Sequence, residues 1–346
     1  MTFAAVATVG MHVTEPAAPK RVHVPVIPFS EHAVPTAFCD EVEAEIIRVK
    51  ELTGNKPFGL NFHMFQTNAN QLLDLAIEHK VRAVSYGRGP DKKVVGRLRD
   101  AGIVCMPTVG ALKHAQKAIE MGANAITVQG GEGGGHTGSV PSTVLIPQVV
   151  DAVKVPVIAA GGFYDGRGLL AALAYGAQGI AMGTRFLMTS DSGIPSATLD
   201  RYLQAKDAEK IQISYLVDGM PQRMIPNEYL QMLEKSSPFK RLRIAVQLAL
   251  QWKSQTGMTT QQALAILWKG FREDPGSTAQ NVMAANAPML LQRSMTDGKP
   301  AEGVMSSGQV AALINQLDSC ETVIQGIMRQ AQDRQLAIKQ YSGQDA

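Results

Sequence analysis

The residues best suited to chemistry lie in one short stretch, Ala125–Gly138, with the sequence AITVQGGEGGGHTG. His136 follows a cluster of glycines there, and histidine is the residue type that exchanges a proton near neutral pH. Glycine has no Cβ, so such a backbone can turn freely and approach a ligand closely. The stretch therefore predicts a ligand-holding loop with His136 as its acid–base group. The alternatives are a flexible connection with a surface histidine, or a structural histidine bonded to a loop carbonyl.

The segments around this loop alternate between strand-like and helix-like runs. Ala125–Val128, Val155–Gly162 and Gly179–Thr184 are apolar runs that lead into Gly, Thr or Gln. Helical stretches of about four turns separate them, which predicts consecutive βα units with backbone N–H groups presented at one face. Gly161-Gly162 and Gly183-Thr184 stand at the last two strand ends. Their N–H groups and hydroxyl suit a phosphate.

Two motifs in series carry a family resemblance. VQGGEGGGHTG and PVIAAGGFYDGRGLLAALAYGAQGIAMGTRFL resemble the signature of the nitronate monooxygenase family, formerly called 2-nitropropane dioxygenases. The resemblance runs from about Glu41 to the C-terminus. The segments VDGMPQRM and AANAPMLL look most like the branch of CoA-ester ring oxidoreductases from actinobacterial steroid breakdown. The resemblance implies an α/β fold, a TIM (β/α)8 barrel that binds FMN, with a C-terminal helical lid domain and atypical opening strands.

The resemblance also implies roles for individual residues. His136 would project over the flavin as general base or acid and take a proton α to a nitro group or a CoA thioester carbonyl, while the flavin takes electrons. Asn61 is also read as a possible turn cap. Thr108 aligns with a lysine that some members place against the flavin, which is a departure from the family. The implied cofactor contacts are Asn61, Gln129, Gly134, Gly161, Gly162, Ala181, Met182, Gly183 and Thr184.

Three functions follow as expectations. The first is an FMN-dependent oxidoreductase of nitronate monooxygenase type that oxidises alkyl nitronates or nitroalkanes with O2. The alternative acts on a CoA-thioester ring or enoyl substrate, with a nicotinamide as redox partner, and the third is a degenerate barrel with impaired flavin binding. A basic cluster is read either as a solvated helix face or as a dock for CoA phosphates. Its members are Lys235, Lys240, Arg241, Arg243 and Lys253. The sequence leaves the physiological substrate, the electron acceptor and a possible homodimer open.

The remaining pattern predicts the organisation of the chain. Residues 57–190 contain six βα units, so a barrel needs two more strands. Helices are expected over Glu43–Leu52, Ser190–Ala208 and Ser306–Ile338, and a strand over Pro57–Phe62. The predicted parts are an atypical N-terminal segment (1–40), an FMN-binding barrel (41–210), a helical substrate or lid domain (211–300), and C-terminal helices packed on the barrel (301–346).

Residues 1–40 do not resemble the opening of the family. One hypothesis is a frameshifted or misassigned start, after which family sequence resumes at Glu41. The other is that Ala4–Val9 and Val22–Phe29 supply two replacement strands for the barrel.

Composition limits the class of protein. The 346 residues are 45% hydrophobic and 18% charged, with a net charge of +3, which is typical of one large core plus a smaller appendage. The interspersed charges do not favour nucleic acid, and no apolar run is long enough for a membrane span. No basic residue precedes the apolar run Phe3–Met11, so we expect a cytoplasmic protein rather than a secreted one. Three widely separated cysteines predict neither a disulfide framework nor a metal site.

Overall fold

The computed structural model describes residues 7–9, 35–63, 69–87, 92–237 and 287–341, and most of 239–250. Two expectations fall outside these ranges, the strand Val22–Phe29 and the basic residue Lys253. Within the described ranges, no helix is long and apolar enough to cross a membrane. In the same ranges, no group of three His, Cys, Asp or Glu side chains is arranged to hold a metal ion.

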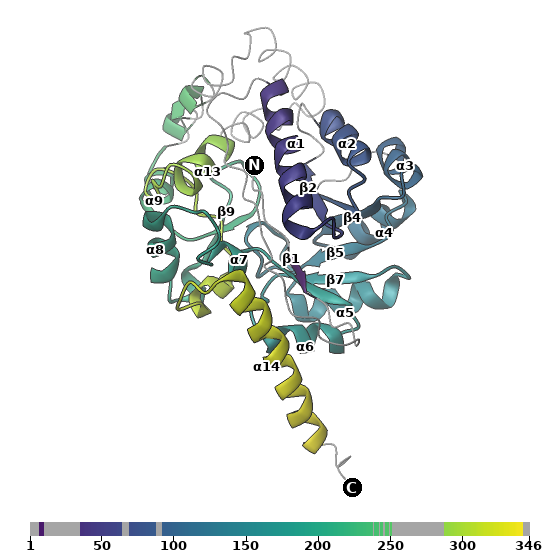
Figure 1. Ribbon diagram of the computed structural model, residues 1–346. Coiled ribbons are helices and arrows are strands. Elements are labelled where there is room, and N and C mark those ends of the chain that lie inside the picture. Colours follow the sequence, from purple (N-terminus) through teal and green to yellow (C-terminus); the bar gives the residue numbers. More distant parts are fainter. Residues whose placement is uncertain are drawn as a thin grey trace.

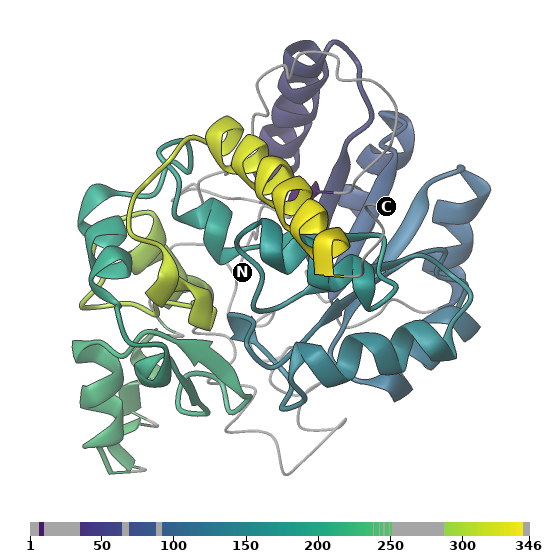
Figure 2. The ribbon, with the colours of Figure 1, turned by 90° about the horizontal axis from the view of Figure 1, so that it is seen from below.

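Six parallel strands alternate with helices, as the periodicity of residues 57–190 predicts. The sheet order is β8-β7-β5-β4-β3-β2, and Figures 1 and 2 show the helices around these strands. The elements in chain order are α1 (Pro35–Thr53), β2 (Gly59–His63), α2 (Ala69–Glu78), β3 (Ala83–Gly87), α3 (Lys92–Asp100), β4 (Val104–Val109), α4 (Leu112–Glu120), β5 (Ile126–Gln129), α5 (Ser142–Ala152), β7 (Val157–Ala160), α6 (Gly166–Ala174), β8 (Gly179–Met182) and α7 (Thr184–Leu187).

The two faces of the curled sheet differ in polarity. Alternate residues of the strands pack with the surrounding helices in two apolar cores, Val128 on β5 and Ile180 on β8 in one, and Val84 and Tyr86 on β3 in the other. The residues between them face the other way, and the strand register aligns them in rows. One row contains Asn61, Ser85 and Met106, and another contains Gln129, Ala160 and Ala181. The inner face of the sheet therefore combines polar and small side chains with bulkier ones such as Met106 and Ile158.

The strand β1 (Ala7–Val9) pairs with β8, but in the antiparallel direction, with Thr8 opposite Ala181. The expected replacement strand Ala4–Val9 is therefore present in part. It is not a barrel strand in the usual sense, because the strands of a TIM barrel all run parallel.

A second sheet of three short antiparallel strands has the order β6-β10-β9. Its strands are β6 (Gly135–His136), β9 (Gln212–Ser214) and β10 (Gln222–Met224). The end of the glycine-rich loop is thus an edge strand rather than a free loop, with His136 opposite Gln222. This sheet joins a segment predicted as barrel to one predicted as lid.

The other helices are α8 (Ser196–Gln204), η1 (Ala208–Lys210), α9 (Glu228–Glu234), α13 (Ala287–Met295), η3 (Gln309–Leu313) and α14 (Cys320–Tyr341). The helix expected over Ser190–Ala208 starts later, with Pro195 at its N-cap. The helix expected from Ser306 was wrong over its first part, since α14 begins only at Cys320. The Cys320 N–H donates to the Asp191 carboxylate at 2.7 Å.

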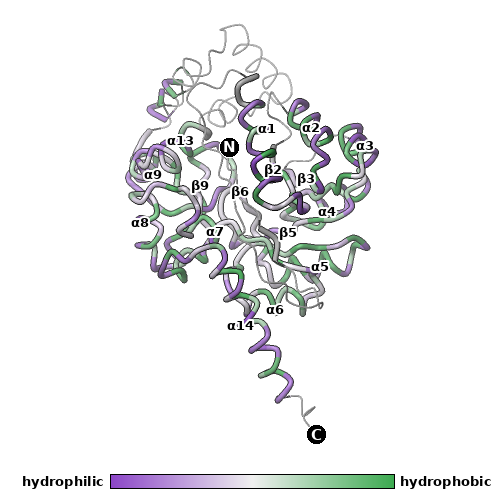
Figure 3. Tube along the Cα trace, in the orientation of Figure 1, coloured by the Kyte–Doolittle hydropathy of each residue, from purple (hydrophilic) through white to green (hydrophobic). Residues whose placement is uncertain are grey.

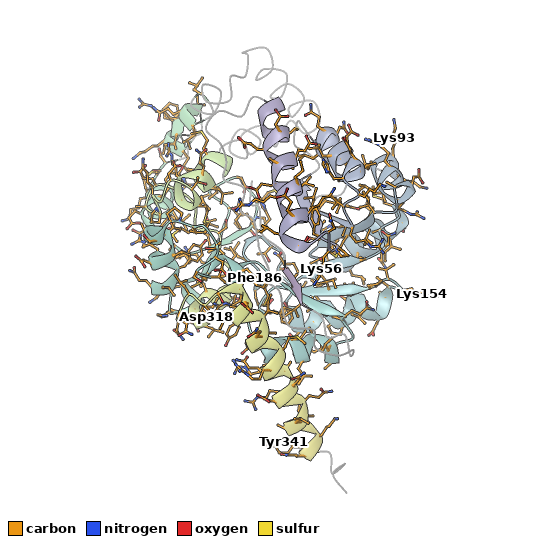
Figure 4. The ribbon with its side chains drawn as sticks, in the orientation of Figure 1. Lys56, Lys93, Lys154, Phe186, Asp318 and Tyr341 are labelled. Atoms are coloured by element: carbon orange, nitrogen blue, oxygen red, sulfur yellow. The ribbon has the colours of Figure 1, made fainter. Side chains whose placement is uncertain are left out.

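The helix α14 packs its first half on α6 and extends its second half away from the body (Figure 1). The buried residues Cys320, Val323, Ile327 and Ala331 all lie between Cys320 and Ala331, and none of them is in the rest of the helix. Figure 4 places Tyr341 at the far end, and that side chain is exposed. Both hydrophilic and hydrophobic residues occur along the projecting part (Figure 3).

Candidate active site

The glycine-rich loop starts at the end of β5 and packs closely against the end of β7. The Gly130 N–H donates to the Ala160 carbonyl at 2.9 Å. Gly161 has φ of +88°, and a Cβ there would lie 2.8 Å from the Gly130 carbonyl oxygen. A side chain at Gly161 would therefore face both a strained backbone and a steric clash. Glycine at this position allows the two strand ends to meet.

A segment remote in sequence, Ser306–Gly308, closes the other side of the loop. The Gly308 N–H donates to the Thr184 hydroxyl oxygen at 2.9 Å, and the Ser307 N–H donates to the Arg223 carbonyl at 3.1 Å. A Cβ at Gly134 would lie 2.5 Å from the Gly308 nitrogen. These contacts explain why Ser306–Gly308 is not helical, because its N–H groups bond to other segments.

His136 contacts a buried carboxylate. Its Nε2 lies 2.6 Å from Asp218 Oδ2, and the Gln222 side-chain amide donates to the same oxygen at 2.5 Å. The Asp218 side chain is 4% exposed, whereas the His136 side chain is 44% exposed. The Nε2 edge of the imidazole thus contacts a buried group, and the ring remains partly exposed to solvent.

The electrostatics of Asp218 favour an ionised carboxylate. Burial alone raises the pKa of Asp218, but the hydrogen bond and charge of His136 and the bonds from the Met220 N–H and Gln222 outweigh it. The pKa is therefore below its ordinary value. A buried carboxylate that stays ionised is a strong acceptor for an imidazole N–H.

Gln129, a predicted cofactor contact, also supports the histidine. Its side-chain amide donates to the His136 carbonyl at 3.1 Å. A Cβ at Gly133 would lie 2.6 Å from this amide nitrogen, so the glycine leaves room for Gln129 beneath the loop. Gln129 therefore fixes the backbone of His136.

The predicted phosphate-binding residues follow two adjacent strands, β7 and β8. Gly162 lies beside the Glu132 side chain, while a Cβ at Gly183 would meet no atom within 4 Å. The space above Gly183 is thus open on the protein side. On β8, Ala181 faces the inner side of the sheet, whereas the Met182 side chain packs in the outer core with Ile180. Any contact of Met182 with a cofactor would therefore come from its backbone.

Asn61 lies apart from this group. It is on β2, at the opposite edge of the parallel strands from β8, and its side-chain amide donates to the Ser85 hydroxyl at 3.0 Å. The buried Thr127 hydroxyl on β5 has no hydrogen-bond partner among the described residues. A hydroxyl of this kind on the inner face can donate a hydrogen bond to a ligand or accept one from it.

The predicted basic cluster is only partly available to a ligand. The Arg241 guanidinium donates to the carbonyls of Leu233 and Glu234 at 2.8 and 3.3 Å, so it caps α9. Lys235, Lys240 and Arg243 are exposed.

Sequence reasoning did not identify Asp218 and Gln222 as functional. They lie 82 and 86 residues after His136 and belong to VDGMPQRM, which was noted for its resemblance alone. No spacing rule links a loop histidine to such a distant carboxylate. The available signal was an acidic residue in an otherwise apolar Gly-Met-Pro turn.

Comparison with curated proteins finds two dehydrogenases at 43% identity. Both are named (3aS,4S,5R,7aS)-5-hydroxy-7a-methyl-1-oxo-octahydro-1H-indene-4-carboxyl-CoA dehydrogenase. The Rhodococcus jostii protein matches 84% of this chain and 82% of its own length, and the Mycobacterium tuberculosis protein matches 86% and 84%. A probable nitronate monooxygenase of Staphylococcus saprophyticus is 34% identical over 47% of this chain and 49% of its own.

Solved structures agree in fold. FabK from Thermotoga maritima superposes with a TM-score of 0.68 at 26% identity, covering 88% of this chain and 84% of that one. Nitroalkane oxidase from Streptomyces ansochromogenes superposes with a TM-score of 0.64 at 22% identity, covering 86% and 87%. The predicted α/β fold of TIM-barrel type is confirmed.

The model of the nitronate monooxygenase family matches residues 63–330. This family consists of flavin-dependent oxidoreductases, and the two dehydrogenases correspond to the alternative function named from the sequence. The match covers most of the chain, including the loop, His136, Asp218 and both strand ends. The chain therefore belongs to the nitronate monooxygenase family.

Proposed function

We propose that this chain is an FMN-dependent oxidoreductase in which His136 is the group that accepts the substrate proton. The observation that carries the proposal is the accessible imidazole of His136 on a buried, ionised carboxylate, at the edge where β5, β7 and β8 end. Proton transfer by a positioned histidine is worth about 10²- to 10⁴-fold in rate.

The residues at this edge fit FMN. Gly183 leaves open space beside the end of β8, and the Thr184 hydroxyl, which accepts from Gly308, can still donate to a phosphate oxygen. The polar inner face, with Gln129 and the unpaired Thr127 hydroxyl, suits the polar edge of a ring system. The proposed holders here are Gln129, Gly134, Gly161, Gly162, Ala181, the backbone of Met182, Gly183 and Thr184, and Asn61 is proposed as a further contact from β2 at the other end of the strand order. When bound, FMN supplies the two-electron acceptor.

For the substrate we favour a CoA thioester of a hydroxylated ring acid. The support is the 43% identity to two such dehydrogenases over more than four-fifths of the chain. A proton α to the thioester carbonyl is acidified by that group, so a histidine base can remove it. Lys235, Lys240 and Arg243 are exposed cations that can meet CoA phosphates, and the segment 211–300 would act as the substrate domain.

The second candidate substrate is an alkyl nitronate or nitroalkane, oxidised with O2. The family match and the similarity to nitroalkane oxidase favour it. A nitro group acidifies the adjacent C–H in the same way, so His136 would have the same role with a nitroalkane, whereas a nitronate has already lost that proton.

Anaerobic mixing of the FMN-loaded protein with each substrate separates these cases. A ring-acid CoA thioester and propionate 3-nitronate are added in turn, and the loss of flavin absorbance at about 450 nm is followed by stopped flow. We expect the CoA thioester to reduce the flavin faster. Reduction by the nitronate alone would select the second candidate, and a bound flavin that neither substrate reduces would contradict the proposed function.

A further inference from the structure

The side chains around His136 form a hydrogen-bonded cluster that also fixes the orientation of the Asp218 carboxylate. The loop before β10 provides Asp218, β10 provides Gln222, and both side chains are buried. The Asp218 carboxylate accepts from the Met220 N–H at 3.0 Å on Oδ1 and from Gln222 at 2.5 Å on Oδ2. His136 Nε2 approaches the same Oδ2 at 2.6 Å.

For a neutral ring, one placement of the proton satisfies this geometry. An ionised carboxylate accepts hydrogen bonds and donates none, so a contact of 2.6 Å to Nε2 requires a proton on Nε2. The lowered pKa of Asp218 agrees with an ionised carboxylate. Gln222 Nε2 also lies 3.2 Å from His136 Nε2, but it is closer to Asp218 Oδ2, at 2.5 Å, so one of its two hydrogens is directed to the carboxylate. A lone pair on Nε2 would instead face the carboxylate oxygen and be repelled by it.

We infer that Asp218 is a positioning residue that holds the proton of His136 on Nε2, so that Nδ1 is the atom that accepts the substrate proton. Gln222 holds the carboxylate in line with the ring. In the step itself the substrate C–H bond breaks, its electron pair stays on the substrate as the enolate of the thioester, and an Nδ1–H bond forms, which leaves an imidazolium beside a carboxylate. This inference rests on the proposed function for the step, but the tautomer itself does not depend on any substrate.

The neighbouring charged groups are bonded elsewhere. Arg223 follows Gln222 on β10, so its side chain faces the opposite side of the strand, and it donates to the carbonyls of Gly131 and Ile211. Glu132 accepts from Ser142. Within the described ranges, Asp218 is thus the ionised group bonded to His136, so the imidazolium formed by the transfer is paired with a carboxylate.

The His136 backbone is held independently of Asp218. Gln222 pairs with His136 across β6 and β10, the Thr137 N–H donates to the Pro221 carbonyl at 3.2 Å, and Gln129 holds the His136 carbonyl. Replacement of Asp218 by the isosteric asparagine therefore leaves the ring near its place. The asparagine amide can donate to Nε2, which moves the ring proton to Nδ1 and removes the base.

The test is the tautomer of His136, read from ¹⁵N NMR of histidine-labelled FMN-loaded protein without substrate, at a pH where the ring is neutral. His136→Gln assigns the signals. We expect the Nε2–H form in the wild type and the Nδ1–H form in Asp218→Asn. The rate of flavin reduction in Asp218→Asn should fall at least about 100-fold with FMN content unchanged. Asp207→Asn is the matched control, because that carboxylate accepts from the Glu209 N–H and pairs with Lys210 rather than with His136.

An Nδ1–H form in the wild type would overturn the inference, and this measurement needs no variant. An unchanged tautomer and an unchanged rate in Asp218→Asn would also overturn it. If the tautomers behave as expected but neither substrate reduces the flavin, the proposed function fails and the assignment of the ring proton stands.

Discussion

At the scale of single residues, Asp218 links the site to the stability of the fold. Its pKa is lowered from an ordinary value of 3.8, so its ionised form is favoured in the folded chain. A lowered pKa stabilises the fold above the unfolded-state value, and that contribution is lost as the pH falls through the folded-state value. The acid side of the stability curve therefore carries a signature of this carboxylate.

We predict that the free energy of unfolding falls more steeply with decreasing pH in the wild type than in Asp218→Asn, below about pH 4. The difference in slope is at most about 1.4 kcal/mol per pH unit, the value for one proton. Urea unfolding followed by circular dichroism between about pH 5 and about pH 3 measures it. Identical slopes would show that folding does not lower the pKa of Asp218.

Gly183 separates cofactor binding from folding. A Cβ there meets no protein atom within 4 Å, and its φ of −86° is accessible to any residue, so Gly183→Val should fold. We expect FMN affinity to fall at least about tenfold, because the side chain enters the space proposed for phosphate. Titration of apoprotein with FMN, followed by flavin fluorescence, measures this. Wild-type affinity in Gly183→Val would place the phosphate elsewhere, and Gly183→Ala is the smaller matched change.

The sequence identified His136 because a titratable group among glycines is a local pattern. The sequence did not identify Asp218 and Gln222, because their contacts with His136 join distant segments through the pairing of β6 and β10. Gln129 shows a third case. Its place at a strand end was predicted, but its hydrogen bond to the His136 carbonyl depends on the path of the loop, which composition does not specify.

At the scale of elements, the joint between α6 and α14 depends on a glycine. A Cβ at Gly166 would collide with the backbone of Ile327 and Ala331, whereas a Cβ at Gly326 on the same helix α14 meets nothing within 4 Å. The Gly166 N–H also donates to the Gln330 side chain at 3.1 Å. The two glycines form a natural pair of test positions.

We predict that Gly166→Ala lowers the free energy of unfolding by about 1–3 kcal/mol through overpacking. Gly326→Ala should raise it by about 0.5–1 kcal/mol, because alanine is favoured in a helix interior. Chemical denaturation of both variants measures the pair. A neutral Gly166→Ala would mean that α14 does not pack on α6 as described.

The six βα units were predictable because each strand is an apolar run and each helix an amphipathic one. The helix expected over Ser306–Ile338 was wrong at Ser306–Gly308, because Ser307 and Gly308 donate their N–H groups to Arg223 and Thr184, and the short η3 precedes α14. Tertiary hydrogen bonds replaced the helical ones there, and helical propensity gives no sign of this. The strand β6 likewise depends on hydrogen bonds to a distant segment, the strand β10.

At the scale of the whole molecule, the parallel strands follow the family fold, while the strand β1 departs from it by its direction. The open edge of β8 pairs with Ala7–Val9 in the antiparallel direction. An unpaired strand edge accepts an extended segment in either direction, and a short apolar run does not encode which. The sequence could therefore suggest a replacement strand but not its orientation.

The central claim for the whole molecule is that one loop both contacts the flavin and supplies the base. The most direct test is the anaerobic rate at which the ring-acid CoA thioester reduces the flavin in the wild type and in His136→Ala, with the bound FMN of each protein quantified. We predict equal FMN content and a rate at least about 100-fold lower in His136→Ala, since the variant lacks the proton acceptor. A reduction rate equal to that of the wild type would contradict the account.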